Sequence, residues 1–164
     1  TVQKNQLEKV LSEAKEENNQ LQNTVDLGST LTVSDVVATS LKDNGKKTNL
    51  AKKVGKLRIT FTINENRISK DGIKKVYLVL TNPLGEVVKD NNSGVVELKD
   101  QGQKVYSSIG EINYTTGLVK KVSFDTDFTK LFVDGIYKVQ LYENGYKISE
   151  TKLVLKKHKI LWFI

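Results

Sequence analysis

The side chains that could do chemistry here are mostly carboxylates and amines, because this 164-residue chain has no Cys and a single His, His158. One His argues against a Ser-His-Asp triad or a His-based metal site. Glu111 and Glu143 could form an acid/base pair, but nothing in the sequence marks a raised pKa for either. We therefore predict no catalytic residue, no cofactor and no enzymatic activity.

Three carboxylates lie close together in sequence, at Asp125, Asp127 and Asp134. Clustered oxygen ligands suit hard cations, so these residues are a candidate Ca²⁺ site. The favoured alternative is turn chemistry, in which Asp accepts hydrogen bonds from nearby backbone. We predict no metal site.

Basic residues give the chain a net charge of +7 and gather in two segments, residues 42–58 and 152–159. Such clusters could bind nucleic acid, acidic polysaccharide or anionic lipid. The favoured alternative is a solvated surface, because the 26 basic residues include only two Arg and no aromatic residue interleaves with segment 42–58. The candidate polyanion-binding residues are Lys42, Lys46, Lys47, Lys52, Lys53 and Lys56.

The first 28 residues carry a heptad pattern that predicts a coiled-coil helix. Asn18 falls at a core position, where it favours a parallel dimer. An amphipathic helix packed on its own domain is the alternative. Because the chain begins at Thr1 and contains no Met, we expect a coil that continues upstream. The predicted oligomerisation residues are Leu7, Leu11, Ala14, Asn18, Leu21 and Val25.

After the coil, alternating apolar residues predict short strands. Residues 29–55 are expected to form an edge strand and a basic connection, and residues 56–157 a β-sandwich with a bend at Gly110. The pattern is clearest at 57–63, and Asn144-Gly145 is typical of a type I′ hairpin turn. About eight strands without a long helix between them predict two packed antiparallel sheets.

The last segment, 158–164, ends in five apolar residues, Ile160, Leu161, Trp162, Phe163 and Ile164. Such a tail packs on the sandwich, docks on a partner by strand addition, or touches a membrane. No stretch of about 18 apolar residues is present to span a bilayer. We keep these five residues as a candidate docking segment.

The stretch Asp134-Gly135-Ile136-Tyr137-Lys138-Val139 resembles the tyrosine corner of immunoglobulin-like sandwiches. There is no Cys pair and no Trp on the expected third strand, so the resemblance is to the broad immunoglobulin-like or fibronectin-like class. It implies that Tyr137 has a structural role, with its hydroxyl bonded to backbone.

The order of segments also resembles envelope proteins of Bacteroidota-type bacteria, which combine a membrane anchor, a coiled coil and an immunoglobulin-like domain. The resemblance rests on "KLRITFTINEN", "VYLVLTNPLGEVV", "YSSIGEINYTTGLVKKVSFD" and "GIYKVQLYENGYKI". Such proteins are often labelled chromosome-partitioning proteins, but this chain lacks the Gly-rich Lys-Ser/Thr phosphate loop of a partitioning ATPase. The resemblance implies a periplasmic or other extracytoplasmic location, with an anchor upstream; a cytoplasmic location stays open.

Together these features predict a non-enzymatic interaction or structural protein, whose coil dimerises and whose sandwich contacts an unidentified envelope protein. A module that binds nucleic acid or acidic polysaccharide through its Lys clusters is the first alternative. A Ca²⁺- or glycan-dependent adhesin is the second.

Overall fold

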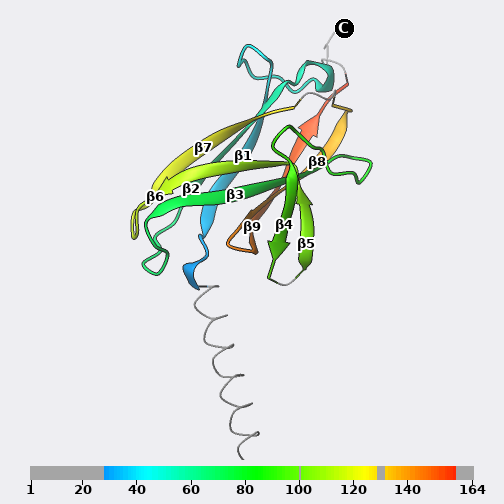
Figure 1. Cartoon of the computed structure of the whole chain (residues 1–164). Helices are drawn as coiled ribbons and strands as arrows, with labels where there is room; N and C mark the ends of the chain where they lie inside the picture. The colour runs from blue at the N-terminus through cyan, green and yellow to red at the C-terminus, as the bar shows by residue number, and fades with distance from the viewer. Residues whose placement is uncertain (1–27, 100, 129–131, 158–164) are drawn as a thin grey trace, which may run out of the picture.

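The computed structural model describes residues 28–99, 101–128 and 132–157 (Figure 1). The predicted coil lies outside these residues apart from Gly28, and so does the apolar tail 158–164. Within the described ranges, no helix is long and apolar enough to cross a membrane. The elements there are β1 (Val33–Leu41), the short 3-10 helix η1 (Ala51–Lys53), β2 (Lys56–Ile63), β3 (Gly72–Thr81), β4 (Gly94–Leu98), β5 (Gly102–Tyr106), β6 (Ser108–Tyr114), β7 (Lys120–Asp127), β8 (Gly135–Glu143) and β9 (Tyr146–Leu155).

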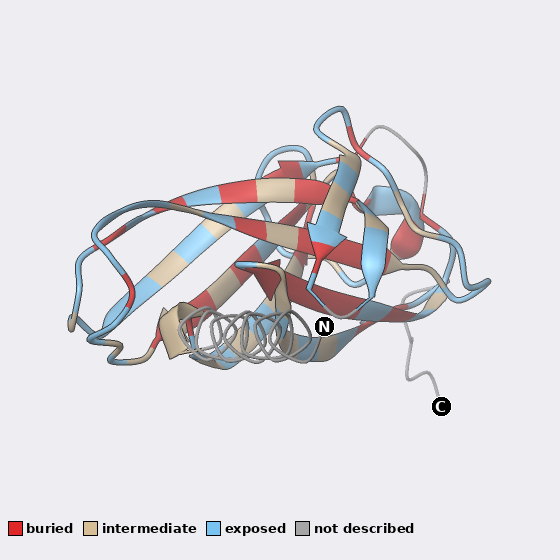
Figure 2. Cartoon of the chain, turned by 60° about the horizontal axis from the view of Figure 1, so that its bottom comes forward, coloured by how far each residue is buried: buried red, intermediate tan, exposed pale blue. Residues whose placement is uncertain are grey.

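Two antiparallel sheets enclose the main core. One has the strand order β1-β2-β7 and the other β6-β3-β8-β9. Strand β2 illustrates why they pack: Leu57, Ile59, Phe61 and Ile63 are fully buried, while the residues between them are not. Figure 2 shows buried positions as red bands along the strands. The prediction of a mainly β protein with two packed antiparallel sheets is confirmed.

A hairpin of β4 and β5 forms a separate two-stranded sheet that covers part of the outer face of the four-stranded sheet (Figure 1). Leu98 from the hairpin packs with Val79 and Tyr142 in a second apolar cluster, and the rings of Tyr77 and Tyr106 lie 4.9 Å apart. This cover explains why β3 is apolar on both faces around residues 78–80. The sequence pattern had suggested sandwich strands for these two segments, and they form a flap instead.

Gly110 does not bend the chain as expected, because β6 runs without interruption through it. A Cβ atom there would come within 2.6 Å of the Phe124 ring on β7, so the missing side chain lets the two sheets approach at this side of the sandwich. The break between β5 and β6 falls at Ser107, whose N–H donates to the Leu78 carbonyl at 2.7 Å.

The predicted type I′ turn at Asn144-Gly145 is confirmed by its backbone geometry, and a second tight turn follows β3. Asn144 and Gly145 have φ values of 54° and 84°, as a type I′ turn requires, and they join β8 to β9. After β3, the Gly85 N–H donates to the Asn82 carbonyl at 3.0 Å. Both turns therefore follow from local chemistry that the sequence displays.

Tyr137 holds the start of β8 to the segment before it. Its side chain is buried, and its hydroxyl donates to the Val133 carbonyl at 2.6 Å. Burial raises the pKa of this hydroxyl above its ordinary value. The predicted structural role, with the hydroxyl bonded to backbone, is confirmed.

We expect Tyr137→Phe to lower the free energy of unfolding by about 1 kcal/mol, the usual net value of one hydrogen bond. For a domain of this size, the loss corresponds to a fall of roughly 3–6 °C in Tm, measured by circular dichroism. Tyr146→Phe is the matched control, because no hydrogen bond is found for the Tyr146 hydroxyl within the described ranges. Equal Tm values for the two variants would contradict the structural assignment.

Candidate functional site

Two of the three candidate Ca²⁺ ligands, Asp125 and Asp127, lie on β7 and face basic residues of β2, whereas Asp134 lies just before β8. Arg58 donates to both oxygens of Asp125, at 2.8 and 3.1 Å, and this bond lowers the Asp125 pKa. Lys56 lies 3.8 Å from Asp127. These are cross-strand ion pairs in register, so the expected turn chemistry is wrong for both residues. Across the described ranges, no three His, Asp or Glu side chains gather closely enough to hold a metal ion.

Glu111 and Glu143 have separate environments. Glu111 is exposed on β6 opposite Lys75, whereas Glu143 is 5% exposed at the end of β8. Glu143 lines a surface hollow of about 410 Å³ together with residues such as Lys74 and Tyr77. Glu111 is not among its lining residues. The structure therefore gives no support to an acid/base pair.

Glu143 belongs instead to a set of contacts that fixes where the chain enters the sandwich. It accepts a hydrogen bond from the Leu31 N–H at 2.9 Å. The Asn66 side-chain amide donates to the carbonyls of Gly28 and Thr30, each at 3.1 Å. The Asn144 amide reaches the Thr30 hydroxyl, also at 3.1 Å. We call residues 28–31 with these partners the N-terminal junction.

At the opposite end of the sandwich, the two basic segments meet (Figure 1). The Lys156 N–H donates to the Asn49 carbonyl at 2.7 Å, and the Ala51 N–H donates to the Lys156 carbonyl at 2.9 Å. These bonds place η1 and the turn before it beside the end of β9. The surface so formed, which we call the cationic end, contains Lys42, Lys46, Lys47, Lys52, Lys53, Lys156 and Lys157.

The lysines of the cationic end differ from the other basic residues nearby in having no acidic partner. None of the seven makes an ion pair with a described residue, and all except Lys42 are exposed. Of the predicted polyanion-binding residues, Lys56 is therefore the exception, because it pairs with Asp127. The sequence identified the lysines but missed their union with the C-terminal strand, for which it carries no local signal.

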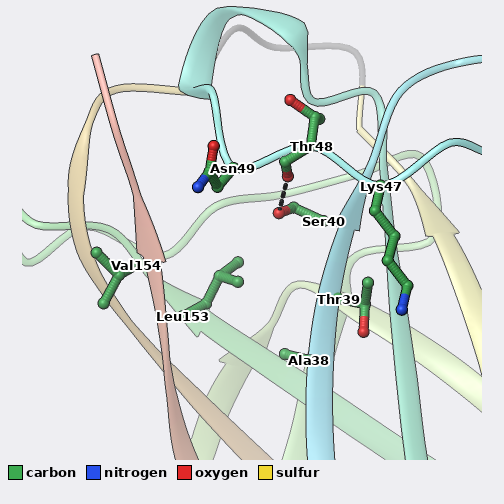
Figure 3. Close-up of a pocket in the computed structure, with 8 residues that line it drawn as sticks. All are labelled: Ala38, Thr39, Ser40, Lys47, Thr48, Asn49, Leu153 and Val154. Atoms are coloured by element: carbon green, nitrogen blue, oxygen red, sulfur yellow. Dashed lines mark hydrogen bonds between the residues drawn. The ribbon is translucent and has the colours of Figure 1, made fainter. Parts of the chain in front are cut away.

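A groove runs between β1 and β9 below the cationic end. Each of these strands is the edge of its own sheet, and the two lie alongside each other without pairing. Figure 3 shows Ala38 and Leu153 in the space between them, with Thr48 and Asn49 above. A hydrogen bond from the Ser40 hydroxyl to the Thr48 carbonyl closes the upper end. This β1–β9 groove measures about 440 Å³ and is lined by Ala38, Thr39, Ser40, Lys47, Thr48, Asn49, Leu153 and Val154.

The fold and these surfaces define a class: a single antiparallel β-sandwich with a small covering hairpin, a polar junction at one end and a cationic end at the other. The chain belongs to the family described as Domain of unknown function (DUF8428), whose model matches residues 32–156. That match covers both sheets, the hairpin and the cationic end except Lys157.

Comparison with other proteins adds little to the family assignment. No curated protein matches the chain. One solved structure to which it is similar is Pseudomonas fluorescens alkylpurine DNA glycosylase AlkC bound to DNA containing an abasic site analog, at 13% identity and a TM-score of 0.44. The match covers 77% of this chain and 30% of that one. A TM-score this low is too weak to transfer the fold or activity of that enzyme.

The buried carboxylate of Glu143 makes a pH-dependent prediction. Burial raises its pKa, against the opposing effects of the Leu31 N–H and Lys74. The folded state therefore binds this proton more tightly than the unfolded state does. The resulting stabilisation is complete below the unfolded pKa of about 4.3 and is lost as pH rises through the folded pKa.

We expect Glu143→Gln, which keeps an oxygen acceptor for the Leu31 N–H, to raise Tm at pH 7 by roughly 2–4 °C, with the difference shrinking toward pH 4. Glu150→Gln is the opposite control. The Glu150 pKa is lowered by its bond from Gln140, so losing that charge should lower Tm at pH 7. Thermal melts from pH 4 to 8 test both. A Glu143→Gln variant that is less stable at every pH would contradict the assignment.

Proposed function

We propose that this domain is a non-enzymatic binding module, held through its N-terminal junction and presenting its cationic end to a partner. The observation that carries the proposal is the placement of these two features at opposite ends of one sandwich. Strand β1 begins beside the junction, at Val33, and ends at Leu41 beside the basic connection. The cationic end therefore lies at the far end of the sandwich from residues 28–31 (Figure 1).

The β-sandwich is suited to act as a rigid scaffold that presents a binding surface. Its strand order, β1-β2-β7 against β6-β3-β8-β9, together with the Tyr137 corner, supports membership of the immunoglobulin-like or fibronectin-like class. Domains of that architecture serve many unrelated functions, so the class supports a rigid scaffold and not a specific task. Three of the candidate carboxylates, Asp125, Asp127 and Glu143, are engaged in ion pairs or a backbone hydrogen bond, which favours binding over chemistry.

The N-terminal junction would transmit the orientation of the upstream segment to the sandwich. Asn66, Glu143 and Asn144 contact the backbone or side chains of residues 28–31 from separate parts of the fold. If residues 1–28 form the proposed parallel dimer, two cationic ends would face the same partner and gain avidity without new contacts. We place this module in the bacterial cell envelope, where the upstream segment would lead to an anchor.

A second candidate function, the binding of nucleic acid or acidic polysaccharide, is favoured by the union of the two basic segments. Seven lysines at one end could neutralise a line of phosphates or carboxylates. The Ca²⁺-dependent adhesin has less support, since Asp125 and Asp127 already face Arg58 and Lys56.

The test is capture from solubilised cell envelope, after nuclease treatment, by the immobilised full chain. We compare two triple variants. The cationic-end variant combines Lys52→Gln, Lys53→Gln and Lys156→Gln. The control removes the same charge elsewhere and combines Lys70→Gln, Lys75→Gln and Lys121→Gln. We expect specific proteins to be retained at high salt, with about tenfold less captured by the cationic-end variant only. Equal capture by the two variants would contradict the proposal. Capture that disappears with nuclease treatment would favour nucleic acid.

The proposed dimer has its own test at Asn18, which lies outside the described residues. Asn18→Leu removes the polar core residue that would specify two strands, so we expect tighter or broader oligomerisation, by about tenfold in the dissociation constant. Sedimentation equilibrium measures it. Unchanged mass and stability would favour a helix packed on its own sandwich.

A further inference from the structure

We propose that the β1–β9 groove is a strand-addition site for an extended acidic peptide, which pairs with the open main-chain edge of β9. This inference rests on the proposed function, because it names the chemistry of the partner that the module binds. Three observations carry it: a row of main-chain groups without partners, a segment of this chain that already adds to the same edge, and lysines placed around the groove.

The first observation is the open edge of β9. Lys156 directs both its N–H and its carbonyl away from β8, toward residues 49–51. Because successive residues of a strand alternate sides, Val154 and Lys152 direct theirs the same way. Neither has a backbone partner on that side among the described residues. The edge of β9 therefore offers donors and acceptors for another strand.

The β1 side of the groove also exposes main-chain groups. The Ser40 carbonyl accepts from the Thr48 N–H at 3.0 Å, so this edge of β1 also faces the groove. Two residues earlier, Ala38 presents its main chain to the groove with no partner there in the described part of the chain. The small side chain of Ala38 leaves room between the two strands, beside Leu153 of β9 (Figure 3).

The second observation is that the chain itself already shows how a strand adds at this edge. Leu50 forms a parallel bridge with Lys156, through the bonds of Asn49 and Ala51. This contact stops after one residue, because the chain turns into η1 at Ala51. An incoming peptide would continue along the same edge, past Val154 toward Lys152.

The third observation is charge, which argues for an acidic peptide over a second copy of this chain. Lys47 lines the groove, Lys156 lies at its upper end and Lys152 lies on β9, and none has an acidic partner among the described residues. Lysines on an open edge repel an identical edge, which is a common protection against self-association. The same charges attract a strand that carries carboxylates.

The shape of the groove favours a peptide over nucleic acid. Main-chain edges pair with an extended peptide through both N–H and carbonyl groups, whereas the sugar-phosphate backbone of DNA offers acceptors for the N–H groups but no donor for the carbonyls. Arg58, on the neighbouring strand β2, already donates through Nε and Nη2 to the two carboxylate oxygens of Asp125. Among the residues that the structure describes, no aromatic side chain lines the groove to stack on a base.

The experiment measures binding of the full chain to a fluorescently labelled peptide of alternating Glu and Val, by anisotropy. Two further peptides carry N-methyl groups on every Glu or on every Val. In a paired strand, only one of these sets of N–H groups faces β9. We expect one methylated peptide to bind at least about tenfold more weakly than the parent and the other to bind about as well.

Protein variants test whether the peptide binds at the β1–β9 groove. Val154→Pro removes an N–H that has no described partner on an edge strand, where Pro is tolerated, so binding should fall about tenfold with little change in Tm. Lys47→Gln should weaken binding several-fold, and Lys121→Gln, at the other end of the molecule, should not. If Val154→Pro fails to fold, the methylated peptides still decide.

Equal binding of the two methylated peptides, or no effect of Lys47→Gln, would overturn the inference. Duplex DNA that binds more tightly than the peptide, with the same sensitivity to Lys47→Gln, would assign the surface to polyanions instead. Self-association of the unmodified chain that Val154→Pro removes would assign the edge to a second copy. If the peptides do not bind but capture of envelope proteins still depends on the cationic end, the strand-addition site is contradicted. The proposed function is then still supported.

Discussion

Two hydrogen bonds on the main chain of Lys156 determine the shape of the cationic end. They tie residues 49–51 to the end of β9, and so bring together lysines that lie about a hundred residues apart in the chain. Apolar anchors support these bonds: Ala51 and Val54 are buried in the main core on either side of Lys52 and Lys53. Burying a side chain such as Val contributes about 1.5–3 kcal/mol, which exceeds the screened repulsion between exposed lysines. The core thus holds a charged surface that would otherwise spread apart.

The two long sides of the sandwich differ in what lies between their edge strands. On the side of β6 and β7, the missing side chain of Gly110 lets the Phe124 ring pack against the backbone of the opposite sheet. On the side of β1 and β9, the two edge strands lie alongside each other without pairing, and the hydrogen bond between Ser40 and Thr48 closes the upper end of the groove. An edge left open in this way carries a risk of self-association. Lysines along it reduce that risk while leaving the edge available to a partner of opposite charge.

Sequence patterns predicted the parts of the fold that local chemistry decides. The alternation of β2, the Asn144-Gly145 turn and the Tyr137 corner each depend on a few neighbouring residues, and all are present. The pairings between distant segments were not predictable in this way. A period of two indicates which face of a strand is buried but not which strand lies beside it. For that reason the pattern of residues 94–106 predicts two strands of the sandwich, whereas they form the β4–β5 flap. The lysines were identified, but the groove they surround was not.

In the proposed complex, the lysines and the main-chain edge would control different steps of binding. Exposed charges without partners raise the rate of encounter with an acidic peptide, and added salt screens that effect within about 10 Å. Main-chain pairing forms only after encounter, so it governs the lifetime of the complex. Salt should therefore slow association far more than it speeds dissociation. A purely electrostatic surface would behave differently, because salt would weaken every contact that holds its ligand. The different salt dependence of association and dissociation thus follows from the arrangement of the groove. The charges of Lys47 and Lys156 lie at its upper part, whereas the main-chain N–H and carbonyl groups along the edge of β9 are neutral.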